Sequence, residues 1–127
     1  MGRQRPSPPS LAPAARQDIR EVLRWSERNF GPAAAARYGA LIKQAVRDIG
    51  SDPGRSGSKE RPEIMIQSAR TYHLEFSRSR VRGGKVKEPR YFLLYRRTED
   101  GKIGVARILH DLQRHLPERY RRLAPPL

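Results

Sequence analysis

Cysteine is absent from this chain of 127 residues, and histidine occurs only three times. Without thiols the chain forms no disulfide, offers no thiolate nucleophile and lacks the commonest zinc ligand. Three histidines scattered along the sequence make a poor metal cluster, so we expect no metal site and no cofactor. Acidic residues are also scarce, because 13 Asp and Glu stand against 27 Lys and Arg.

Long apolar runs are missing as well. No stretch approaches the roughly 20 apolar residues that a membrane span needs. The first residues lead into prolines rather than into the apolar stretch of a signal peptide, so we expect a cytoplasmic protein without membrane contact. The length fits a single domain over residues 1–127, with a core at about 10–117 and flexible ends at 1–9 and 124–127.

The net charge of +14 is the strongest global feature of the sequence. A surface of this sign attracts nucleic acid or an acidic protein over several ångströms. Such an excess on a small domain also costs stability through self-repulsion, which makes a purely solubilising role the weaker explanation. We therefore expect a polyanionic partner.

Two consecutive stretches carry the apolar spacing of helices. The first runs from Pro13 to Phe30, and Gly31 is placed to end it. The second begins at Pro32 and repeats apolar residues at 3.6-residue spacing as far as Gly50. The single-residue break predicts an antiparallel helical hairpin. In the first helix we expect three acidic residues in surface ion pairs and the tryptophan at the edge of the core or in a partner groove: Asp18, Glu21, Glu27 and Trp25.

Three later stretches have the composition of β-strands. They span residues 71–77, 91–97 and 103–110, and the Asp-Gly pair at 100–101 predicts that the last two form a hairpin. In the first of them, His73 and Glu75 alternate with apolar neighbours and should leave the core face. Residues 51–63 are turn formers and predict a loop.

The remaining segments have weaker signals. Prolines limit the first 13 residues to a short edge strand at best. Residues 78–90 are rich in Arg and Lys and should project into water. Four apolar residues after position 111 suggest a short C-terminal helix: Leu112, Leu116, Tyr120 and Leu123. The predicted fold is α+β, with a helical hairpin packed on one face of a small antiparallel β-sheet and a short C-terminal helix.

This order of elements resembles the RelE/ParE toxin superfamily of type II toxin–antitoxin systems. Five stretches carry the resemblance, and together they cover roughly residues 10–117: Ala14 to Ile19, Pro32 to Tyr38, Thr71 to Leu74, Tyr91 to Arg96, and Arg107 to Asp111, the last followed by Arg114, His115 and Leu116. The resemblance implies a toxin encoded beside its antitoxin.

Ribosome-dependent RNA cleavers of this superfamily, such as RelE, carry a set of basic residues that is largely missing here. By alignment, the positions of that set fall on His73, Glu75, Phe92 and Leu112. Loss of one preorganised charge-stabilising donor typically costs about a hundredfold in rate, which argues against RelE-type catalysis. A nuclease built from other residues remains the alternative, with ribosome and mRNA as partners, and its catalytic set would be His110, Arg96 and Arg107.

The ParE branch, by resemblance, inhibits DNA gyrase by binding and traps its cleaved DNA complex without chemistry of its own. It implies two partners: the gyrase–DNA complex and a cognate acidic antitoxin, ParD-like or of another kind. The target-binding residues expected from this resemblance are His73, Arg96, His110, Arg114, His115, Arg119, Arg121 and Arg122. A second set forms a basic loop that either binds polyanion or a partner, or is only solvated: Arg78, Arg80, Arg82, Lys85 and Lys87.

Overall fold

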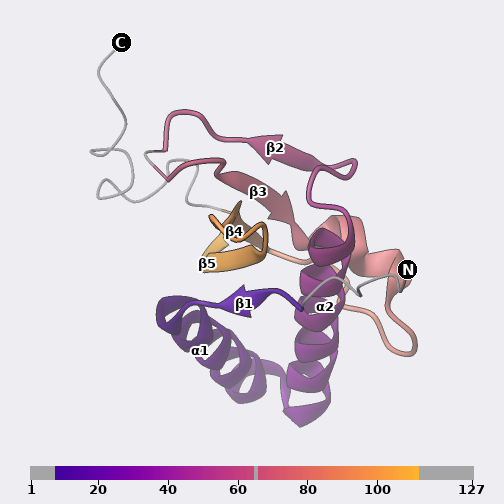
Figure 1. Cartoon of the computed structure of the whole chain (residues 1–127). Helices are drawn as coiled ribbons and strands as arrows, with labels where there is room; N and C mark the ends of the chain where they lie inside the picture. The colour runs from indigo at the N-terminus through magenta and orange to yellow at the C-terminus, as the bar shows by residue number, and fades with distance from the viewer. Residues whose placement is uncertain (1–7, 65, 112–127) are drawn as a thin grey trace.

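The structure, a computed structural model, describes residues 8–64 and 66–111. Figure 1 shows the two helices side by side against one face of a sheet. In chain order the elements are β1 (Ser10–Leu11), α1 (Pro13–Phe30), α2 (Pro32–Ser51), β2 (Ser58–Glu60), β3 (Arg70–His73), the 3-10 helix η1 (Leu74–Arg80), β4 (Tyr91–Arg97) and β5 (Ile103–His110).

The helical hairpin is confirmed almost to the residue. Pro13 and Pro32 each occupy the first turn of a helix, where the missing N–H has no intrahelical partner to lose. Gly31 lies between the helices with a φ of 91°, a backbone conformation that favours glycine, and its N–H closes α1 on the Glu27 carbonyl at 2.8 Å. Among the described residues, no helix is both long enough and apolar enough to cross a membrane.

The five strands form one sheet in the order β1-β5-β4-β3-β2. β1 runs parallel to β5, with Ser10 opposite Gly104, whereas the other three pairs are antiparallel. The prediction of a wholly antiparallel sheet is therefore wrong, although the short edge strand expected before Pro13 is confirmed. β4 and β5 form the predicted hairpin, in which Gly101 has a φ of 81°.

Two local predictions are wrong. The expected loop at 51–63 contains β2, which adds an outer edge to the sheet. The strand expected at 71–77 ends at His73, where the chain turns into η1. The reason is one local and one distant hydrogen bond: the His73 ring accepts from the N–H of Glu75, and the hydroxyl of Ser77 donates to the carboxylate of Asp48 in α2.

The sheet has apolar residues on both faces. The larger core lies between the sheet and the helices, and among its buried residues are Leu41 and Ile49 from α2, Tyr72 from β3, and Leu93 from β4. A smaller cluster on Leu94 and Leu109 packs against the connection between β2 and β3, through residues such as Ile64. The helices therefore cover one face of the sheet, and the connection between β2 and β3 packs on the other.

The basic segment at 78–90 projects into water only in part: Arg82, Lys85 and Lys87 are exposed as predicted, but other residues of the segment pack inward. Val81 is buried in the larger core. The guanidinium of Arg78 donates to the carbonyl of Val86, and the ammonium of Lys85 donates to the carbonyl of Val81. The long basic side chains thus satisfy backbone groups of their own segment, which folds back on itself.

Candidate target-binding site

One end of the sheet gathers polar side chains from neighbouring strands. His73 is the last residue of β3, and Tyr91 begins β4 opposite His110, the last residue of β5. The chain then adds Asp111, whose N–H donates to the carbonyl of Arg90 at 2.8 Å. We call these five residues the sheet-end cluster. Antiparallel pairing brings them together, because the end of one strand meets the beginning of the next.

Asp111 lies at the centre of this cluster. Its carboxylate lies 3.2 Å from Nε2 of His73, 3.4 Å from Nε of Arg90 and 3.6 Å from Nδ1 of His110. His73 also uses its other nitrogen, since Nδ1 accepts a 3.0 Å hydrogen bond from the N–H of Glu75. The proton of the neutral ring therefore lies on Nε2 and points to Asp111. Both ring nitrogens of His73 are thus engaged by groups of the chain itself.

Aromatic rings close the cluster on the helix side. Tyr91 packs edge-to-face on His110, with 5.1 Å between ring centroids, and on Tyr38 of α2 at 5.8 Å. Burial raises the pKa of both tyrosines above their ordinary value, and the Asp111 carboxylate adds to the rise at Tyr91. Both phenols therefore remain neutral near pH 7, and neither supplies a base.

Asp18 contradicts the prediction that it forms a surface ion pair. It is buried, and its carboxylate accepts two hydrogen bonds from Arg107 of β5, from Nε at 2.7 Å and from Nη2 at 3.0 Å. It also accepts from the N–H of Ile108 at 2.9 Å. The bidentate pair ties α1 to β5. By contrast, Glu21 and Glu27 are exposed, as predicted.

Arg96 lies far from the sheet-end cluster. It pairs with Gly104, five positions along β4 from Tyr91, or about 16 Å at roughly 3.3 Å per residue. The structure thus brings together His73 and His110 from the predicted target-binding set but leaves Arg96 at the opposite end. In the alternative nuclease set, Arg96 is likewise at the other end of the sheet from His110, and Arg107 is paired with Asp18 of α1.

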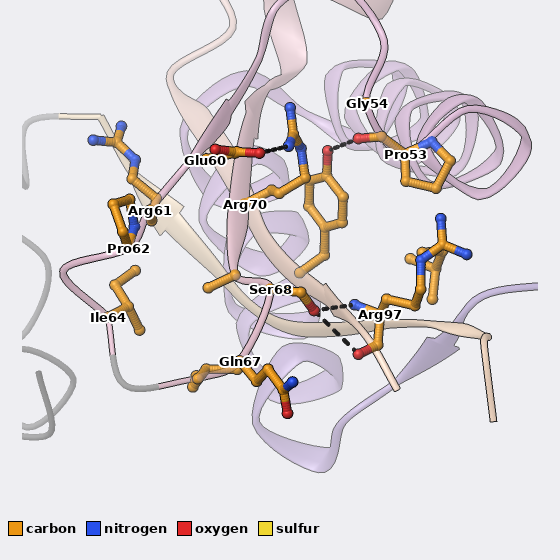
Figure 2. A pocket seen from close by; sticks show the side chains of 14 residues that line it. Pro53, Gly54, Glu60, Arg61, Pro62, Ile64, Gln67, Ser68, Arg70 and Arg97 are labelled. Atoms are coloured by element: carbon orange, nitrogen blue, oxygen red, sulfur yellow. Dashed lines mark hydrogen bonds and ion pairs between the residues drawn. The ribbon is translucent and has the colours of Figure 1, made fainter. Parts of the chain in front are cut away.

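A pocket of about 470 Å³ lies at that opposite end, and Figure 2 shows the side chains around it. Ser68 has a φ of 59°, and its hydroxyl is hydrogen-bonded to the backbone N–H and carbonyl of Arg97. Arg70 donates to Glu60 at 3.3 Å. The contacts drawn in this pocket join residues of the chain to each other, so they account for its shape without a ligand.

A second buried carboxylate, Asp48 of α2, organises η1. It accepts hydrogen bonds from Ser77 at 2.6 Å, from Gln44 at 2.9 Å and from Arg80 at 2.9 Å, and Arg55 lies 3.4 Å away. Burial alone would raise the pKa of Asp48, but the hydrogen bonds outweigh it, so the pKa lies below its ordinary value. Arg80, predicted as part of a basic loop, is thus an ion-pair partner of α2.

The helices form a groove of about 910 Å³ with the segment that follows η1. Its lining includes Leu23 of α1 and Gly39 of α2, where an added Cβ would lie 3.8 Å from the leucine side chain. Basic residues also line the groove: Lys43, Arg47, Arg80 and Arg82. Glu27 is the acidic residue of the lining, so the groove joins an apolar surface to charge that is mainly positive.

Sequence reasoning found only part of this site. His73 and His110 were identified from their strands, but Arg90 and Asp111 were missed because each lies just outside a strand, where no periodicity marks it. The signal for both is the strand register, which puts the residue before β4 next to the residue after β5. The predicted target-binding residues after position 111 and the C-terminal helix lie outside the described residues: Arg114, His115, Arg119, Arg121 and Arg122.

Residues 10–115 match the family model of the ParE toxin of the type II toxin-antitoxin system, parDE. The match covers β1 through β5 and therefore includes every residue of the sheet-end cluster. A search of curated proteins finds no match.

Proposed function

The chain belongs to the ParE toxin family of type II toxin–antitoxin systems, and from this premise we propose that it inhibits DNA gyrase by binding the gyrase–DNA complex. Binding is favoured over catalysis because two side chains that could take part in catalysis already interact with other groups of the chain. His73 uses both ring nitrogens, and Arg107 is held by Asp18. The net charge of +14 suits a target that contains DNA.

A supercoiling assay tests this proposal. We expect the chain to arrest supercoiling by gyrase and to accumulate cleaved DNA, while messages in a translating extract remain intact. The variant His110→Ala should change inhibition by less than about tenfold, because no proton transfer depends on it. Truncation after Leu112 should weaken inhibition strongly, because it removes the basic residues Arg114, Arg119, Arg121 and Arg122. Uninhibited gyrase would contradict the proposal.

Ribosome-dependent cleavage of mRNA is the second candidate. The observation that favours it is the proximity of His110 and Arg90 to Asp111, since a carboxylate can orient an imidazole for acid–base chemistry. Under this alternative, His110→Ala costs about a hundredfold or more in rate. Message cleavage that requires ribosomes and disappears in this variant would establish the nuclease.

The family implies a cognate antitoxin, and we propose that an acidic amphipathic helix of that antitoxin occupies the groove between α1 and α2. The apolar lining around Leu23 and Gly39 suits the apolar face of such a helix, and the basic residues around it suit the acidic face. The small side chains in the lining allow close approach of a partner backbone.

A bulky substitution in the groove tests whether the antitoxin binds there or elsewhere on the toxin. Gly39→Leu should abolish co-elution with the product of the neighbouring gene, because the new side chain fills the groove. Ala33→Leu is the matched control, since Ala33 is exposed on the same helix and does not line the groove. Equal binding by both variants would place the antitoxin elsewhere on the toxin.

A further inference from the structure

An aromatic pair on α1 lies outside the functions assigned so far. Trp25 is 46% exposed and Phe30 is 67% exposed. Their ring centroids lie 5.6 Å apart with an interplanar angle of 67°, an edge-to-face contact. Large aromatic side chains left together on the surface mark a binding site more often than isolated ones do. The contact with Phe30 also restrains the tryptophan ring before any partner arrives.

Trp25 lines a cleft of about 390 Å³ between α1 and the sheet. Val22 and Ile108 contribute apolar surface to this cleft, and Tyr91 lines it from β4. Because Tyr91 packs on His110, the cleft borders the sheet-end cluster. A tryptophan on the helix and a tyrosine on the sheet thus share one open cavity.

Charged residues of both signs surround this cleft: Asp18, Glu21 and Arg28 line it, and the Asp18 carboxylate is paired with Arg107. Arg28, in the last turn of α1, lines the cleft and makes no ion pair with another described residue. Arg90 directly precedes Tyr91, and its half-exposed guanidinium lies 3.4 Å from the Asp111 carboxylate through Nε. Glu21, an exposed residue of α1, supplies a carboxylate on the lining. The surface therefore combines aromatic rings and cations with an exposed carboxylate, Glu21, that can accept hydrogen bonds, while the Asp18 carboxylate is already engaged.

We propose that this cleft binds an unpaired nucleobase of a single-stranded nucleic acid. The base stacks on Trp25, the neighbouring phosphates contact Arg28 and Arg90, and Glu21 accepts from amino groups of the base. Every base has a π-face, so stacking on an aromatic ring tolerates any sequence, while basic residues follow the backbone. The net charge of +14 favours this occupant over an apolar protein segment. The inference goes beyond gyrase inhibition, because it concerns direct contact with the strand.

The cleft contains its own reporter, since Trp25 is the only tryptophan of the chain. Single strands of about 12 nucleotides, DNA in one arm and RNA in the other, are titrated into the intact protein. We expect saturable quenching of tryptophan emission at the same Kd that the anisotropy of a labelled strand gives. The same DNA in duplex form should quench far less, because its bases are already paired. The strand type, DNA or RNA, that binds with the lower Kd is the preferred ligand.

Substitutions of the cleft residues test this binding mode. Trp25→Ala should weaken strand binding by about five- to a hundredfold, the range for loss of one stacked base, and Trp25→Phe should restore part of it. Arg28→Gln should weaken binding, whereas Arg24→Gln, an equal charge change at an exposed position of α1 outside the cleft, should have a smaller effect.

Two results would overturn this inference. Binding without quenching, and unchanged in Trp25→Ala, would place the nucleic acid elsewhere. Failure of every strand to bind would leave the cleft to a protein partner. The supercoiling assay with Trp25→Ala separates the two proposals: an effect on inhibition without an effect on strand binding indicates that Trp25 contacts gyrase itself.

Discussion

The buried pair of Asp18 and Arg107 leads to a quantitative prediction about stability. Replacing Asp18 with alanine leaves the guanidinium of Arg107, whose side chain is 16% exposed, without its carboxylate. It also removes the acceptor of the N–H of Ile108, which is a buried hydrogen bond. Loss of one partner of a buried ion pair costs about 3–5 kcal/mol, because the remaining charge is uncompensated.

That cost is a large part of the stability of a domain of this size, which is about 5–15 kcal/mol. At roughly 4 °C per kcal/mol, Asp18→Ala should lower Tm by about 10–20 °C. The measurement is thermal and urea unfolding followed by circular dichroism. Glu21→Gln is the matched control, because Glu21 is an exposed acid on the same helix, and it should change stability by less than about 0.5 kcal/mol.

The double variant Asp18→Leu/Arg107→Met completes the experiment. It removes both charges together, so its loss of stability should be clearly smaller than the sum of the losses in the two single variants. If Asp18→Ala is as stable as Glu21→Gln, or if the double variant shows simple additivity, then the pair does not connect α1 to β5 in the way that the structure indicates.

Two further predictions concern α2 and the loop that follows it. Gly57 has a φ of 98°, and an added Cβ would lie 2.7 Å from the ring of Phe76, so Gly57→Ala should cost about 1–3 kcal/mol in urea unfolding. Gly54→Ala, where no atom lies within 4 Å, should be near neutral. Because the pKa of Asp48 is lowered in the folded chain, its contribution to stability is complete above about pH 4 and is lost as the pH falls further. Asp48→Asn should therefore lose less stability between about pH 7 and pH 3, and an equal loss would refute this assignment.

The elements that could be predicted from sequence are those with a local, repeated signal. Apolar spacing identifies α1 and α2, and the proline at the start of each marks its first turn. The hairpin of β4 and β5 follows from its Asp-Gly turn. In each case the interactions that select the structure lie within a few residues, so the pattern contains enough information.

The wrong predictions arise from contacts between residues that are distant in the sequence. Asp18 has the spacing of a surface residue, and only its pairing with Arg107, 89 positions later, buries it. In η1, the alternation of apolar residues predicts a strand, but the contact of Ser77 with Asp48, 29 positions earlier, fixes a helical turn. Charge on a polar residue does not reveal whether a distant partner will neutralise it.

The two buried aspartates also change how the charge of the chain should be interpreted. Asp18 engages Arg107 and Asp48 engages Arg80, so arginines that the sequence assigned to catalysis or to a basic loop instead tie the helices to the sheet and to η1. The positive charge that a partner can contact is therefore unevenly distributed over the surface. Arg28 lines the cleft beside Trp25 and contacts no acidic side chain among the described residues, so it presents its charge to solvent there. Binding of a polyanion should then depend more strongly on Arg28 than on Arg80 or Arg107, whose charges are already paired with carboxylates.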